Sequence, residues 1–386
     1  MNIAIDRERL ASTFVELCEI ASPSGHERAI ADHLKRLFAA LGAASVEEDD
    51  SAAATGADSG NLLIRFAGNQ PGRNGFFYSC HMDTVQPGKG VKVRRDNDLF
   101  TSAGDTILGG DDKSGIAAVI ETLRLLRETK ASHPDIEIVI TTCEELGMLG
   151  AQAFDAGRLR GQYGYALDSS GIDRVIVGAP AANKFSITIT GAAAHAGLQP
   201  EMGISAIAVA AKAISQIRLG RLDGESTANF GVIAGGVATN IVPESVVIDG
   251  EVRSHDPEKL AIYSNEIERV FYDTAASWPE TITESGPKRP TVAINLKAEY
   301  PAMRLAADSP VIRRIRAAGA SLDKKLEFIV AGGGSDANIF SGKGRPTAIV
   351  ATGMDLVHTT RERLRLDDLV ELTRLLFAIA VCPDPA

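Results

Sequence analysis

Four short apolar runs with the composition of buried strands constrain the fold of this chain most. A helical pattern at 113–128 precedes the third of them, and the runs occupy residues 61–68, 75–81, 136–145 and 163–170. Strands that alternate with helices form largely parallel sheets with helices on both faces. Two helical patterns, separated by the turn ASPSGHE at 21–27, precede the first run. The first part of the chain therefore predicts an α/β domain.

The pattern changes near Ala179. Beyond it, the predicted order is strand, helix, strand, strand, helix, strand, over residues 183–191, 203–218, 228–236, 245–254, 257–276 and 291–300. This βαββαβ order is typical of ferredoxin-like domains. After about Met303 the α/β pattern returns, with helices near 310–320 and 367–381 and strands at 326–332 and 346–352. The sequence predicts one α/β domain, 1–180 with 303–386, interrupted by an inserted domain at 181–302.

Composition excludes several classes of function. The net charge is −10 and Lys and Arg form no basic block, which argues against a nucleic-acid partner. No stretch reaches 18 apolar residues, and the first residues meet charges by Asp6, so we expect no membrane span and a cytoplasmic protein. The four cysteines are widely spaced without a CxxC pair, which argues against a redox or zinc-ribbon unit.

Metal-binding side chains follow the ends of the apolar runs. Asp111 precedes the helix at 113–128, and the residues at or after strand ends are His81, Glu144, Glu145, Asp168 and, after a short loop, His358. In open α/β sheets the carboxyl ends of the strands form the ligand crevice. We therefore expect these residues to converge although they are far apart in the sequence.

The chemistry of this set favours a catalytic metal site. Two imidazoles and several carboxylates suit Zn²⁺, Co²⁺ or Mn²⁺ better than a thiolate site or an all-oxygen calcium site. Asp111 and Asp112 stand between two glycines and the helix, where glycine lets the backbone fold closely. One of these two aspartates can bridge a pair of ions about 3.5–4 Å apart, the recurrent arrangement in two-metal hydrolases.

Seven motifs extend this prediction to a family. In chain order they are HMDTV (81–85), GGDDKSGIA (109–117), TCEELGMLGA (142–151), YALDSSG (165–171), AAAHAG (192–197), GGGSDANIF (332–340) and VHTTRE (357–362). With these motifs the chain resembles the M20 metallopeptidase family, and within it the peptidase T group of tripeptide-cleaving aminopeptidases. The resemblance implies a zinc-exopeptidase type of α/β domain with an inserted lid, acting on short peptides.

The resemblance also implies a role for each metal-binding residue. His81 and Asp168 would bind one zinc ion, Glu145 and His358 the other, and Asp111 would bridge the two. Co²⁺ or Mn²⁺ are the expected substitutes for Zn²⁺. Metal-bound hydroxide would attack the peptide carbonyl.

Further roles come from the same resemblance. Glu144 would be the general base, and Asp83 would accept a hydrogen bond from the imidazole of His81. His195 would donate to the oxyanion, often at the site of the neighbouring subunit in a homodimer formed through the lid. The residues implied for binding the substrate carboxylate are Arg253, Asn240, Gly333 and Ser335.

Alternatives remain open at this point. An N-acyl amino-acid deacylase or a carboxypeptidase would share the fold and metals, and a non-catalytic binding protein would share the fold alone. Glu144 and Glu145 could also serve only as favourable acids at a helix N-terminus, because EELG resembles the start of a helix.

Overall fold

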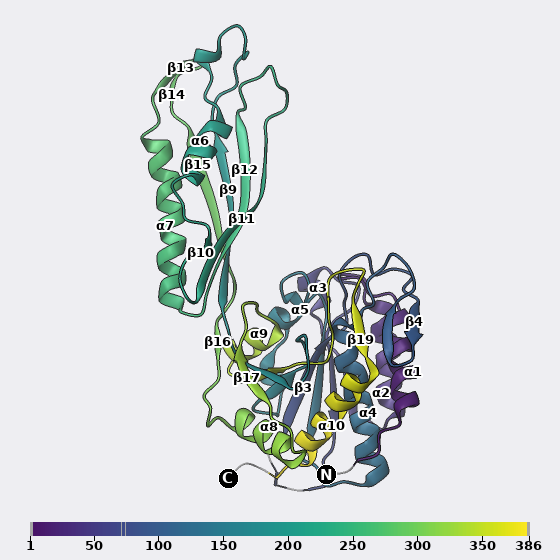
Figure 1. Cartoon of the computed structure of the whole chain (residues 1–386). Coiled ribbons are helices and arrows are strands. Elements are labelled where there is room, and N and C mark those ends of the chain that lie inside the picture. The colour runs from purple at the N-terminus through teal and green to yellow at the C-terminus, as the bar shows by residue number, and fades with distance from the viewer. Residues whose placement is uncertain (1–2, 71, 74, 384–386) are drawn as a thin grey trace. The chain divides into compact units, whose positions relative to one another are not determined.

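The computed structural model describes residues 3–70, 72–73 and 75–383 (Figure 1). Its chain divides into two compact units. Unit 1 comprises Met1–Ala179 with Met303–Ala386, and unit 2 comprises Pro180–Ala302. Unit 2 is therefore inserted into the sequence of unit 1.

Unit 1 is built on a nine-stranded sheet in the order β1-β2-β6-β3-β7-β18-β8-β16, with β17 paired to β8. Its strands are β1 (Ser45–Glu48), β2 (Leu62–Phe66), β3 (Phe76–His81), β6 (Ile136–Thr141), β7 (Gly164–Ala166), β8 (Arg174–Ala179), β16 (Met303–Arg304), β17 (Glu327–Val330) and β18 (Thr347–Val350). The four adjacent strands β6, β3, β7 and β18 run parallel. Antiparallel pairs flank them on both sides.

The centre of this sheet confirms the predicted α/β fold. Every residue of β3 and β6 is buried, which explains why both strands are mostly apolar and do not alternate regularly between apolar and polar residues. The third run is shorter than predicted, because β6 ends at Thr141 rather than at residue 145.

Helices cover both faces of the sheet (Figure 1). The main core contains residues of α1 (Arg7–Glu19), α2 (Arg28–Ala40), α4 (Gly110–Thr129), α8 (Pro310–Ser321) and α10 (Leu366–Val381). The opposite face carries α9 (Asp336–Gly342), next to α5 (Leu149–Ala153), which contacts α3 (Ala52–Thr55). Alternation along β18 shows the two faces, since Ala348 and Val350 join the main core and Ile349 packs with Ala337 of α9.

One small sheet of unit 1 was not predicted. It contains β4 (Val93–Asp96), β5 (Leu99–Ser102) and β19 (Arg363–Arg365), in the order β19-β5-β4. The sequence of β4 is VRRD and three of its four residues are exposed, so it lacks an apolar pattern. The strand β19 follows directly after the predicted ligand loop that carries His358.

Unit 2 has the predicted βαββαβ order. Its elements are β9 (Ala181–Thr190), α6 (Ala206–Ile214), β10 (Gly220–Arg221), β11 (Ser226–Gly235), β12 (Ser245–Ser254), α7 (Pro257–Ala276) and β15 (Thr291–Tyr300), with a small hairpin of β13 (Thr281–Thr283) and β14 (Gly286–Lys288). The five-stranded sheet has the order β10-β11-β12-β9-β15 and is antiparallel throughout. Both α6 and α7 contact β9 and β12 of this sheet.

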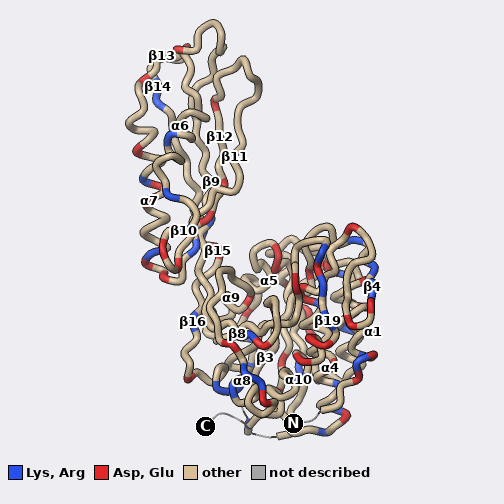
Figure 2. Tube along the Cα trace, viewed as in Figure 1, with Lys and Arg blue, Asp and Glu red and all other residues tan. Residues whose placement is uncertain are grey.

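Charged residues of both signs are distributed over both units. Figure 2 shows Lys and Arg interspersed with Asp and Glu along the trace of both units. Among the described residues, no helix combines the length and the apolar character that a bilayer crossing requires.

Candidate metal centre

The four central strands of unit 1 deliver the predicted side chains to one edge of the sheet. His81 is the last residue of β3, Glu144 and Glu145 follow β6, Asp168 follows β7, and His358 lies on the loop after β18. Because these strands are adjacent and parallel, their carboxyl ends lie at the same edge.

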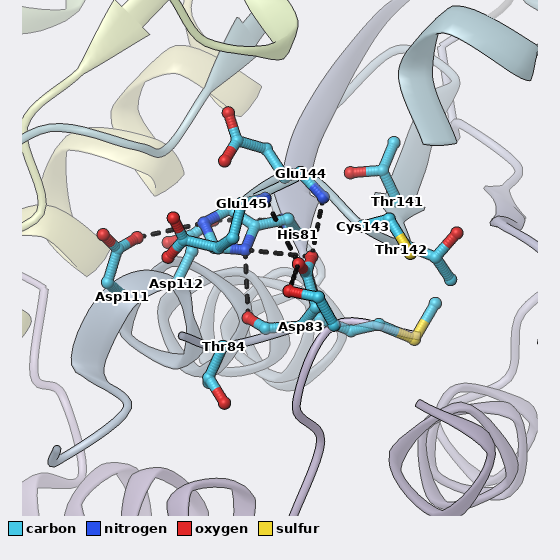
Figure 3. Close-up of polar contacts among 12 residues, drawn as sticks. His81, Asp83, Thr84, Asp111, Asp112, Thr141, Thr142, Cys143, Glu144 and Glu145 are labelled. Atoms are coloured by element: carbon cyan, nitrogen blue, oxygen red, sulfur yellow. Dashed lines mark hydrogen bonds and ion pairs between the residues drawn. The ribbon is translucent and has the colours of Figure 1, made fainter. Parts of the chain in front are cut away.

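The carboxylate of Asp111 lies between two histidines. Its Oδ1 is 3.0 Å from Nε2 of His81, a contact drawn in Figure 3, and its Oδ2 is 3.2 Å from Nε2 of His358. Nε2 of His358 also lies 3.1 Å from Oε1 of Glu145. Each oxygen of Asp111 therefore faces a different imidazole, which is the orientation of a carboxylate that bridges two cations.

Two overlapping groups of potential ligands surround His81. One contains His81, Asp111 and Glu145, the other His81, Glu144 and Asp168, and within each group the ligand atoms lie within 4.8 Å of one another. Together with the His358 contacts, this brings all five predicted ligands and Glu144 into one cluster.

The second aspartate has a different task from the first. Asp111 and Asp112 are joined by a cis peptide bond and have non-helical backbone angles at the start of α4. Asp112 is fully buried, and its Oδ1 accepts the N–H of Gly115 at 3.1 Å. A Cβ at Gly115 would lie 2.4 Å from that oxygen, so only glycine fits there. Asp112 thus closes the first turn of α4 while Asp111 faces the histidines.

Asp83 connects two of the segments that carry candidate ligands (Figure 3). Its Oδ1 accepts the N–H of Glu144 at 3.0 Å, and its Oδ2 accepts the N–H of Glu145 at 3.2 Å and the hydroxyl of Ser24 at 2.7 Å. Nδ1 of His81 is 3.1 Å from the main-chain carbonyl oxygen of Asp83 and 3.5 Å from its Oδ1. Either oxygen orients the imidazole so that Nε2 faces Asp111.

The cluster shifts the pKa values of several of its members. Burial opposes ionisation of Asp111, but hydrogen bonds from His358 and His81 outweigh it and lower the pKa of this carboxyl. Hydrogen bonds to Asp111 and Glu145 raise the pKa of His358 to about 10. Burial and the charge of Asp111 raise the pKa of Asp168 to about 8, and burial and Asp168 raise that of Glu144.

These observations fit a pair of divalent cations. Two imidazole nitrogens and three carboxylates form the mixed nitrogen and oxygen donor set that Zn²⁺, Co²⁺ and Mn²⁺ accept. Burial, and after it the negative charge of neighbouring acids, raises the pKa values of Asp168 and Glu144, and positive charge in the site would favour their ionised forms.

Helix capping does not explain Glu144 and Glu145. The next helix, α5, begins at Leu149, so these two acids lie in the preceding turn rather than at a helix N-terminus. Their main-chain N–H groups donate to Asp83 instead. The interpretation of EELG as the start of a helix is therefore wrong.

Comparison with known proteins identifies the family. A sequence model of peptidase family M20/M25/M40 matches residues 77–381. The chain belongs to this family. The M20 resemblance seen in the motifs is thereby confirmed.

Relatives match almost the whole M20 chain. The uncharacterized protein YqjE of Bacillus subtilis strain 168 is 39% identical over 97% of this chain and 98% of its own. The crystal structure of aminopeptidase PepT from Bacillus cereus ATCC 10987 has a TM-score of 0.89 at 38% identity, covering 98% of both chains. A tripeptidase structure from Staphylococcus aureus Mu50 has a TM-score of 0.89 at 36% identity and the same coverage. The chain is thus an M20 metallopeptidase similar to peptidase T enzymes.

Three of the M20 residues predicted from the sequence lie in unit 2. The N–H of Ala196 donates to the carbonyl oxygen of Asn240 at 2.9 Å, which places His195 and Asn240 on neighbouring segments. Arg253 lies on β12, and its Nε is 2.9 Å from Oε1 of Glu251 on the same strand. The roles of these residues stay predictions.

The remaining two predicted substrate-binding residues lie before α9 in unit 1. Ser335 is the N-cap of this helix, since its hydroxyl accepts the N–H of Ala337 at 3.2 Å and its own N–H donates to Oδ1 of Asn338 at 3.1 Å. Both polar groups of Ser335 are therefore engaged in capping, which weighs against its amide as a substrate donor. Gly333 precedes this cap.

Sequence reasoning missed three buried charged residues beside the cluster. Nζ of Lys113 donates to Oγ of Ser22 at 2.8 Å, and Oδ2 of Asp336 accepts the hydroxyl of Thr141 at 2.5 Å. The third is Glu362. All three stand inside the quoted M20 motifs, but nothing in the sequence alone shows that they are buried at the site.

Proposed function

We propose that this M20 peptidase is a di-zinc aminopeptidase that cleaves short peptides, tripeptides among them. The observation that carries the proposal is the carboxylate of Asp111, whose two oxygens face Nε2 of His81 and Nε2 of His358 at 3.0 and 3.2 Å. The names of the PepT and tripeptidase structures, at 38% and 36% identity over 98% of the chain, support the choice of substrate.

The proposed ligand assignment follows the contacts. His81 and Asp168, whose ligand atoms lie within 4.8 Å of each other, would hold one ion, and His358 and Glu145, 3.1 Å apart, would hold the other, with Asp111 as a ligand to both. Two divalent ions bound here would polarise the scissile carbonyl and lower the pKa of the attacking water.

Glu144 is proposed as the general base. Its carboxylate lies within 4.8 Å of the ligand atoms of His81 and Asp168, and burial raises its pKa above the ordinary range, which suits a group that must both accept and return a proton. It takes a proton from the water that attacks the peptide carbonyl. It then delivers this proton to the amide nitrogen of the leaving peptide as the C–N bond breaks.

The residues of unit 2 are proposed to complete the site as a lid. His195 would donate a hydrogen bond to the developing oxyanion. Arg253 would hold the substrate carboxylate with its planar fork, assisted by Asn240 and the amide of Gly333. Closure of a lid excludes water from the reacting amide.

The test compares three forms of one tripeptide: unmodified, N-acetylated and C-terminally amidated. With the zinc-loaded protein we expect hydrolysis of the unmodified peptide at the first bond and loss of activity on the N-acetylated peptide. Preferred hydrolysis of the acetylated form would instead identify a deacylase. Release of the C-terminal residue, abolished by amidation, would identify a carboxypeptidase.

Assembly and localisation complete the proposal. We propose a homodimer formed through unit 2, where the ten-residue strand β15 (Thr291–Tyr300) lies at a sheet edge and can pair with another chain. Sedimentation velocity at micromolar concentration tests this, and a monomer would refute it. We propose the cytoplasm as the compartment, consistent with the absence of a disulfide between the described cysteines.

A further inference from the structure

Glu362 is a buried acid beside the candidate metal centre, and its carboxylate accepts hydrogen bonds from main-chain N–H groups. The residue is 2% exposed. Oε2 accepts the N–H groups of Leu108 and Gly109 at 2.8 Å each, and Oε1 accepts the N–H of Asp111 at 3.0 Å. These three donors belong to the loop that leads into the bridging aspartate, so the carboxylate fixes the backbone of that loop at three points.

The same short loop carries Glu362 and the candidate ligand His358. Asp355 and Arg363 close the loop with two main-chain hydrogen bonds of 3.0 Å, and the N–H of Glu362 donates to the carbonyl oxygen of Thr359 at 3.1 Å. The guanidinium of Arg363 also donates to the carboxylate of Asp355 at 2.8 Å. The spacing between His358 and Glu362 is therefore set by a closed loop.

This loop contacts Asp111 on two sides. Nε2 of His358 meets the side chain at Oδ2, 3.2 Å away, and Oε1 of Glu362 meets the main-chain N–H at 3.0 Å. The fit is close, because a Cβ added to Gly110 would lie 3.1 Å from Oε1 of Glu362. A shift of the Glu362 carboxylate would therefore move the backbone of Asp111 relative to His358.

We propose that Glu362 is a positioning residue that holds Asp111 so that its two oxygens are shared between the two metal positions. The inference rests on the proposed function, because it assigns Glu362 a role in that metal centre. Groups that orient metal ligands typically change metal affinity about 10–100-fold when they are replaced. A residue that only stabilised the fold would lower the melting temperature without this effect.

The test uses the Glu362→Gln variant of the full chain. Glutamine keeps the size of the side chain but offers one oxygen to three N–H donors, and its NH₂ group opposes at least one of them. Glu137→Gln is the matched control, since Oε2 of Glu137 is also buried and accepts the N–H groups of Arg160 and Gly161 at 2.8 Å each. Glu137 lies near the start of β6, at the opposite end from the candidate ligands.

The readouts are calorimetric titration with Zn²⁺, the absorption spectrum of the Co²⁺-loaded protein, and kcat and KM on a tripeptide at saturating metal. For Glu362→Gln we expect affinity for at least one ion to fall about 10–100-fold, with a changed Co²⁺ spectrum and a lower kcat at nearly constant KM. Glu137→Gln should keep the metal affinities of the unmodified protein even where its melting temperature falls.

Two ions bound by Glu362→Gln within about twofold of the unmodified affinity, with an unchanged Co²⁺ spectrum, would overturn the proposal. A second variant, Gly110→Ala, pushes on the same carboxylate, and we expect a smaller loss of metal affinity in the same direction. If Glu362→Gln does not fold, Gly110→Ala becomes the deciding variant. An unchanged metal affinity of Gly110→Ala would also refute the positioning role of Glu362. Failure of the unmodified protein to bind two ions or cleave a tripeptide would instead contradict the proposed function.

Discussion

Replacing Glu144 by glutamine tests the chemistry proposed for the site most directly. Glutamine has nearly the same shape as glutamate but cannot accept the proton of the attacking water. The five proposed metal ligands are untouched by this change, and the N–H of residue 144 still donates to Oδ1 of Asp83. We therefore expect the variant to fold, to bind two ions and to lose hydrolysis.

The surroundings of Glu144 set the expected size of the loss. A positioned general base contributes about 10²–10⁴-fold, or about 3–5 kcal/mol of transition-state stabilisation. The nearest acids cannot replace it readily: Asp168 and Glu145 are proposed metal ligands, and Oδ2 of Asp336 already accepts the hydroxyl of Thr141. We therefore expect a fall in kcat of about 10³–10⁴-fold, at the upper end of that range, with KM little changed.

The assay measures tripeptide hydrolysis and metal content on the same preparation. Glu327→Gln is the control, because Glu327 is 63% exposed at its side chain and pairs only with the surface residue Arg174 among its described ion-pair partners. It should retain full activity and metal. A Glu144→Gln protein with two bound ions and turnover within about tenfold of the unmodified enzyme would refute the proposed base.

Two further predictions concern metal removal and acid stability. Chelation should abolish hydrolysis and lower the melting temperature, because ions bound only by the folded state contribute about 2.7 kcal/mol at a hundredfold excess over Kd; full activity in excess chelator would contradict the metal centre. Hydrogen bonds from Arg28 and Lys35, opposed by burial, lower the pKa of Glu48 from 4.5 to about 2. The folded pKa lies below the unfolded one, so this stabilisation is present above about pH 4.5 and is lost as pH falls through about 2. Glu48→Gln should therefore lower the free energy of unfolding by about 1–2 kcal/mol at pH 7, after allowance for solvent screening, and by nearly nothing at pH 2. Urea unfolding of both proteins across this pH range measures the difference. A difference that does not change with pH would contradict this reasoning.

The sequence predicts the ligand cluster because the candidate ligands lie at or just after the carboxyl ends of strands. The apolar runs that become β3, β6, β7 and β18 are long enough to be recognised, and a candidate ligand lies at or after the end of each. Their adjacency in one parallel block then brings His81, Glu145, Asp168 and His358 together. The same reasoning misses β4, because a solvated strand with the sequence VRRD carries no apolar signal.

Contacts that depend on tertiary packing lie beyond a sequence pattern. Glu362 and Asp111 are 251 residues apart, and their contact involves a main-chain N–H that any residue would offer. Asp83 illustrates a related difficulty. The M20 resemblance implies a contact between Asp83 and the imidazole of His81, two residues earlier. Its carboxylate also accepts the N–H groups of Glu144 and Glu145, and these contacts can be seen only once β3 and β6 are paired.

The acids of this site differ by what faces them rather than by residue type. Asp111 faces two imidazoles, so its pKa falls and it is suited to bridge cations. Glu362 faces main-chain amides that hold its oxygens in place. Glu144 is buried beside Asp168, so its pKa rises and it is suited to carry a proton. The same change from acid to amide should therefore have three different effects. It should remove metal binding at Asp111, weaken metal binding at Glu362 and stop turnover at Glu144.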